Sequence, residues 1–148
     1  MSKIIQALLA GSLFTFICDF FLFLGIKLHY IDAYNIEVYY NILFADNQNF
    51  IIYTILSFFF GYVIIYINHK ISIPLTLVFA LFTLSALIPI VGHAIGESLL
   101  MQKNVQLHDQ HHTYVGDIYY NGRKTITFYD NEIKKVIILQ KNKLKEYQ

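Results

Sequence analysis

Three ionisable side chains lie in or at the end of long apolar stretches, where a charge is costly to keep. His93 and Glu97 are four residues apart, so a helix through them presents both on one face. Asp19 lies at a comparable depth in an earlier apolar stretch. An Asp inside a bilayer costs about 2.5 to 3.5 kcal/mol and usually faces a partner or a wet cavity. We expect Asp19 and His93 to form an intramembrane polar pair joining two helices; a metal site, a proton relay or a haem-ligating His93 would use the same residues.

A second group of metal-ligand types follows in the run His108-Asp109-Gln110-His111-His112. Imidazole and carboxylate suit zinc, copper or nickel, but structural zinc sites have four ligands at defined spacing, which this run does not match. A polar linker rich in histidine is the simpler interpretation. A metal centre here would need completion by His29, Asp32 or Glu97. The candidate metal ligands are therefore His93, Glu97, His108, His111 and His112.

No pattern in the sequence specifies a reaction. The chain has no GxSxG, no P-loop and no HExxH, so we expect no enzymatic activity and no resident cofactor. Lys and Arg number 11 against 10 Asp and Glu, a net charge of +1. Nucleic-acid-binding proteins normally show a concentrated basic face, so we expect no such partner.

Three long apolar runs must position these side chains, and they cover residues 4–25, 50–67 and 73–96. Each is near the roughly 20 residues that a helix needs to cross about 30 Å of hydrocarbon. The chain is 56% hydrophobic and 14% charged, whereas a soluble domain carries about 25% charged residues. We therefore predict an α-helical integral membrane protein with three transmembrane helices. The helices form a domain of residues 1–97, which lies in the lipid bilayer.

Residues 27–49 connect the first two runs. Apolar side chains recur there at helical spacing, in Ile31, Tyr34, Val38 and Ile42. Tyrosine favours the headgroup level, where its ring is dry and its hydroxyl wet. The spacing predicts an amphipathic helix lying in the membrane interface, with an ordered loop packed on the spans as the alternative.

Residues 98–148 are predicted to form a small extramembrane domain. Residues 97–111 are expected to prolong the third helix beyond the bilayer. Asn121-Gly122 is a strong hairpin signal, and a second turn at Asp130-Asn131 completes an antiparallel β-meander of three strands. A sheet this small is not stable alone, so it must pack on the helices, on a second copy or on a partner protein.

Three spans place the 27–49 segment and the C-terminal domain on the same side of the membrane. Near the spans, Lys3 and Lys70 lie on one side and Lys27 and Lys103 on the other, which the positive-inside rule does not separate. Counting all basic residues of the C-terminal domain would place that domain in the cytoplasm. The tight connection between the second and third runs, the start at Lys3 and the acidic 27–49 segment favour a cytoplasmic N-terminus and a C-terminal domain outside the cytoplasm.

These features favour a non-catalytic accessory or assembly subunit of a bacterial inner-membrane complex. Such a subunit acts by docking on a membrane-protein partner or on further copies of itself. Two alternatives stay open: a metal- or haem-handling membrane protein that uses the histidine-rich face, and an immunity-type protein against a membrane-active toxin.

Overall fold

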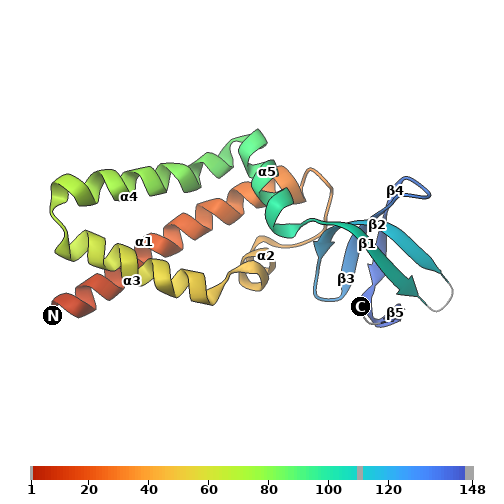
Figure 1. The fold of residues 1–148 in the computed structure, drawn as a ribbon, viewed down its shortest axis with the longest axis horizontal. Helices are drawn as coiled ribbons and strands as arrows, with labels where there is room; N and C mark the ends of the chain where they lie inside the picture. Colours follow the sequence, from red (N-terminus) through yellow and green to blue (C-terminus); the bar gives the residue numbers. More distant parts are fainter. Residues whose placement is uncertain (1, 110–111, 146–148) are drawn as a thin grey trace.

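The computed structural model describes residues 2–109 and 112–145, which form a helical bundle and a sheet (Figure 1). Three long helices make up the bundle: α1 (Lys3–Ile26), α3 (Phe50–Tyr66) and α4 (His69–Leu84). α1 continues directly into a π-helical turn, η1 (Lys27–Ile31). The three helices lie side by side, with the α3–α4 turn at one end and the sheet beyond the other (Figure 1).

Side-chain caps fix where each long helix begins. Ser2, Asn49 and Asn68 accept hydrogen bonds from backbone N–H groups two or three residues further on, at 3.0 to 3.4 Å. These N–H groups have no partner within the helix, and side chains of this kind satisfy them. The first and second helices therefore begin within one residue of the predicted starts.

Small residues bring α1 and α3 into close contact. Ala7 and Gly11 on α1 face Ser57 and Gly61 on α3. A Cβ added to Gly11 would overlap the carbonyl oxygen of Ser57, and one added to Gly61 would overlap that of Ala7. Small residues four apart allow this close backbone approach, which helices in lipid commonly use to associate.

Two helical stretches have the length and hydropathy to cross a membrane, Lys3–Ile31 and His69–Leu87. A third is added if α2 (Tyr40–Asn47) and α3, which meet at 84°, are counted as one bent span. The prediction of three spans is thus confirmed in part: by length and composition, two or three helices could cross a membrane.

The third apolar run, 73–96, is not the single helix predicted. A short 3-10 turn, η2 (Ser85–Leu87), follows α4, and α5 (Pro89–Leu100) begins after a break. Ile88 is extended, with ψ 128°, because a proline disfavours the helical conformation in the residue before it. The proline itself occupies the first turn of α5, where a missing N–H removes no helical hydrogen bond.

The segment 27–49 is not the continuous interfacial helix predicted from its spacing. Residues 36–39 have no helical structure, and only α2 forms a helix after η1. Asn35 has φ 53°, a left-handed conformation that asparagine tolerates and that ends the helical turn before it. Leu43 is fully buried against the bundle. The alternative prediction, an ordered loop packed on the spans, describes this segment better.

The C-terminal residues form five strands: β1 (Gln102–Asp109), β2 (Thr113–Asn121), β3 (Thr125–Asp130), β4 (Lys135–Gln140) and β5 (Leu144–Lys145). They make one antiparallel sheet of order β4-β3-β2-β1-β5. The predicted meander corresponds to β2, β3 and β4. The prediction that residues 97–111 prolong a helix holds to Leu100, where α5 ends, and is wrong for 102–109, which form a strand paired with β2. Residues 110 and 111 lie outside the described residues.

The sheet has a small core of its own, in which Leu107, Ile118, Ile126 and Phe128 are 0 to 3% exposed. A larger buried cluster joins the helices to β2. The sheet thus packs on its own helices, one of the three arrangements that its small size required.

Candidate docking site between the helices and the sheet

Tyrosines attach the sheet to the helices. Tyr30, in η1, is fully buried, and its hydroxyl donates a hydrogen bond to the backbone carbonyl of Tyr119 at 2.8 Å. The ring centroid of Tyr34 lies 4.3 Å from that of Tyr119. Tyr120 is buried in the same cluster as Leu100, the last residue of α5. These contacts hold β2 against the end of the bundle.

Glycines on α5 make room for this junction. A Cβ added to Gly96 would overlap the ring of Tyr30, and one added to Gly92 would lie 2.9 Å from the carbonyl oxygen of Gly25. The small residues at four-residue spacing on α5 do pack closely against another helix, as their spacing indicates. α5 therefore lies tightly on the end of α1.

His93 and Asp19 have other partners than the predicted ones. The His93 ring centroid lies 5.7 Å from that of Tyr30 and 5.5 Å from that of Tyr34. Asp19 accepts a hydrogen bond from Nε2 of Gln48 at 3.1 Å. Among the described residues, no hydrogen bond joins Asp19 to His93. The break before α5 directs His93 towards η1, whereas Asp19 faces the end of α2.

Glu97 forms an ion pair with Lys103 across the α5–β1 junction, with Nζ 2.6 Å from Oε1. The hydrogen bond and charge of Lys103 hold the pKa of Glu97 below its usual range, and Glu97 raises the pKa of Lys103 in turn. The two side chains remain accessible to water, so the pair contributes little to stability.

The other predicted metal ligands lie on or beside the β1–β2 hairpin. His108 Nδ1 is 3.0 Å from Oγ1 of Thr113, and the His112 ring stacks near Tyr114 at 6.3 Å. His111 lies outside the described residues. Across the part of the chain that the structure describes, no three His, Cys, Asp or Glu side chains are grouped so that they could hold a metal ion.

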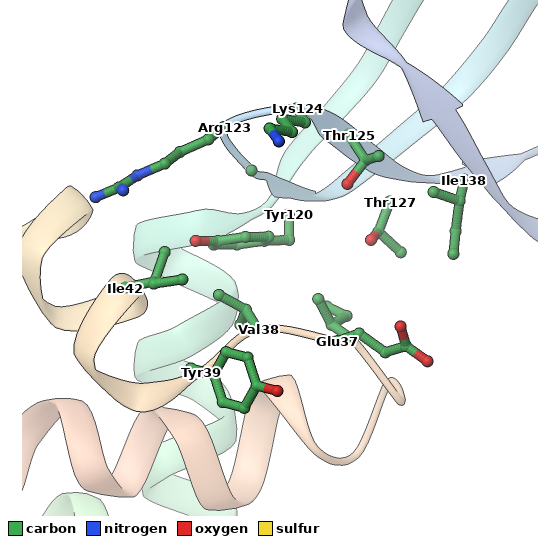
Figure 2. Close-up of a pocket in the computed structure, with 12 residues that line it drawn as sticks. Glu37, Val38, Tyr39, Ile42, Tyr120, Arg123, Lys124, Thr125, Thr127 and Ile138 are labelled. Atoms are coloured by element: carbon green, nitrogen blue, oxygen red, sulfur yellow. The ribbon is translucent and has the colours of Figure 1, made fainter.

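A groove of about 490 Å³ separates the segment before α2 from the underside of the sheet. Tyr120 is 5% exposed, and burial raises the pKa of its hydroxyl. Figure 2 shows its ring between the β2–β3 turn and the side chains of Val38 and Ile42. The remaining lining residues are Ile36, Glu37, Tyr39, Gly122, Arg123, Lys124, Thr125, Thr127 and Ile138.

A charged contact closes one end of the groove. Arg123 reaches from the β2–β3 turn to α2 (Figure 2) and donates to Asp46, with Nε 2.8 Å from Oδ2 and Nη2 2.5 Å from Oδ1. A two-point guanidinium–carboxylate contact fixes orientation as well as distance. The carboxylate of Glu37 lies towards the other end, below Ile138 (Figure 2).

The strand β4 borders the groove and is an edge of the sheet. It pairs with β3 on one side only, and its other side has no strand partner among the described residues. Val136 and Ile138 are 47% and 65% exposed, and Ile138 also lines the groove. An exposed edge with apolar side chains is a template for pairing with another extended chain. The groove and the β4 edge together form the candidate docking site.

Comparison with known proteins gives no match to a protein-family model, a curated protein or a solved structure. The function has to be inferred from the geometry of the docking site.

Sequence reasoning identifies none of the groove residues as functional. One signal points to β4: residues 136–139 are four consecutive apolar residues. Alternate residues of a strand face opposite sides, so such a run is apolar on both faces. Ile137 and Leu139 pack on the small core of the sheet, which leaves Val136 and Ile138 for another surface.

Proposed function

We propose that this protein is a non-catalytic docking subunit of a membrane complex. Its helices anchor it in the bilayer, and its sheet presents the β4 edge and the adjoining groove to an extended segment of a partner membrane protein. The open β4 edge beside an apolar groove is the observation that carries this proposal.

The exposed apolar surface of the bundle supports the membrane placement. Large side chains along α1, α3 and α4 are more than half exposed, an arrangement that suits lipid and would be unfavourable in water. The sheet lies beyond one end of these helices (Figure 1). Examples of the exposed side chains are Ile4, Leu13, Phe50, Phe58, Val78 and Phe82.

We place the protein in the bacterial inner membrane, with the sheet outside the cytoplasm. The N-terminus and the α3–α4 turn lie at the end of the bundle away from the sheet (Figure 1), and they carry Lys3 and Lys70. Lys27 and Lys103 match them at the other end, so the positive-inside rule is neutral near the spans and the tight α3–α4 turn carries this placement.

The composition of the groove supports binding rather than catalysis. Its lining holds one carboxylate, Glu37, and the hydroxyl and amine groups beside it, on Thr125, Thr127, Tyr39, Tyr120 and Lys124, have no His or Cys in the lining to act with them. An extended segment added to β4 would gain main-chain hydrogen bonds from the strand edge. Its side chains on one face would reach Ile138 and the groove, which would provide selectivity.

The test compares two variants of equal chemistry in the full-length protein. Ile138 lines the groove, whereas Ile133, which is 55% exposed, lies in the turn at the far end of β4. Quantitative mass spectrometry of proteins that co-purify in mild detergent should show a partner that is lost with Ile138→Lys and retained with Ile133→Lys. Equal recovery of every co-purifying protein with both variants would refute docking at this site.

A further inference from the structure

A second depression lies at the end of the β2–β3 hairpin nearest the helices, and it is lined only by polar and basic residues. Its volume is about 500 Å³. Backbone pairing holds its rim, because Thr125 pairs with Gln140 and the Lys141 N–H donates to the Lys124 carbonyl at 3.0 Å. The lining residues are Arg123, Lys124, Thr125, Gln140, Lys141 and Asn142, three of them cationic and none acidic.

The contact between Arg123 and Asp46 holds this basic pocket beside α2. Asp46 lies four residues before Phe50, the first residue of α3, whose side chain is 76% exposed. α2 meets α3 at 84°, so α2 lies along the membrane surface when α3 crosses the bilayer. On that placement Arg123, which binds Asp46 of α2, lies beside the headgroup layer, which is about 5 to 8 Å deep on each face.

The charges of the pocket are available to a ligand. The side chains of Lys124 and Lys141 form no ion pair with any described residue, while Arg123 is shared with Asp46. Lysine binds phosphate as a point charge, and the amide of Asn142 and the hydroxyl of Thr125 can donate to phosphate oxygens. Basic residues at the membrane surface attract anionic lipids.

We propose that this pocket binds the phosphate of an anionic phospholipid headgroup. The proposal rests on the membrane placement given above, but not on the docking of a partner protein. A bound headgroup would hold the β2–β3 hairpin against the membrane surface.

The test uses the full-length protein in detergent and native mass spectrometry during titration with phosphatidylglycerol or phosphatidylcholine. Lys124→Gln/Lys141→Gln should weaken phosphatidylglycerol binding about 30-fold, since each headgroup-level lysine contributes about fivefold. Lys134→Gln/Lys135→Gln removes the same charge at the other end of β4, about 17 Å away. That distance is about two Debye lengths, so this control should bind nearly as well as the wild type.

Equal losses in the two double variants would show general electrostatic attraction and overturn the site. Equal binding of phosphatidylcholine, or full displacement of the lipid by inorganic phosphate, would overturn the assignment to an anionic lipid. Loss of partner recovery in Lys124→Gln/Lys141→Gln with unchanged lipid binding would assign the pocket to an acidic protein segment instead. The single variants, each expected to weaken binding about fivefold, test the site if the double variant does not fold. Failure to reconstitute into any bilayer would count against the membrane placement itself.

Discussion

Replacing Tyr30 by Phe removes one hydroxyl from the junction between the helices and the sheet. Tyr30 is fully buried, and its hydroxyl donates to the carbonyl of Tyr119 at 2.8 Å. Loss of the donor leaves that part-buried carbonyl unpaired, at a cost of about 1 to 3 kcal/mol, whereas hydrogen bonds within a membrane average about 0.6 kcal/mol. For a junction at the membrane surface we expect the free energy that holds the sheet on the helices to fall by about 1 to 2 kcal/mol. This changes the equilibrium between the docked and the detached sheet by a factor of about 5 to 30.

Hydrogen–deuterium exchange of the detergent-solubilised protein measures this effect directly. The sheet is too small to stay folded when detached, so Tyr30→Phe should speed exchange of the β2 and β3 amides about 5- to 30-fold. Tyr62→Phe is the matched control, because Tyr62 is 58% exposed and its ring stacks on Tyr66 outside the junction. If β2 and β3 exchange at the same rate in both variants, the Tyr30 hydroxyl does not hold the sheet.

Three further predictions concern the bundle, the groove and the topology. A Gly-to-Ala change inside a helix normally stabilises a protein by about 1 kcal/mol. Gly61→Ala should instead lower the free energy of unfolding in denaturant titrations by about 1 to 3 kcal/mol, because the added methyl overlaps the Ala7 carbonyl. Unchanged or higher stability would refute the close helix contact. Asp46→Asn should speed amide exchange in the β2–β3 turn more at low salt than at high salt. The double exchange Asp46→Arg/Arg123→Asp restores an ion pair and should slow amide exchange again, whereas a salt-independent change would argue against a charge contact. Single cysteines placed in a Cys18→Ser background at Asn47 and Asn142 should react with a thiol reagent from one side of the membrane, and one at Lys70 should react from the other side. Any other grouping would refute the arrangement of the spans.

The apolar helices could be predicted from the sequence because their signals are local. The length of the second apolar run gives α3 to within one residue. The spacing of Gly92 and Gly96 indicates a closely packed face, and the structure has one. Small residues report on packing without any knowledge of the partner, because only they allow backbones to approach closely.

The remaining elements depend on contacts between distant parts of the chain. Residues 102–109 become a strand because β2 is available to pair with them; their own strand signal is limited to the alternation of Val105 and Leu107 with polar residues. Asp19 binds Gln48, a residue in the loop region whose path could not be predicted from helical spacing. The break at Ile88 did have a local signal in Pro89, which ends a helix at the residue before it.

The docking site could not be predicted for the same reason. The groove forms between the 36–42 segment and a sheet that lies some 80 residues later in the chain, and Arg123 and Asp46 close it from the two sides. Only β4 carried a local signal: residues 136–139 are apolar on both faces of the strand, so one face is left without a core to pack on. Which side chains remain exposed depends on the packing of the other face on the sheet core.

The proposal that β4 is a docking surface is tested most directly by photo-crosslinking in the native membrane. A photoreactive amino acid at Ile138 should give a discrete adduct with one partner protein, and the same amino acid at Ile133 should not, because only Ile138 borders the groove. Adducts that are identical at both positions, that contain only lipid, or that contain only a second copy of this chain would contradict a docking subunit that receives a partner protein along β4.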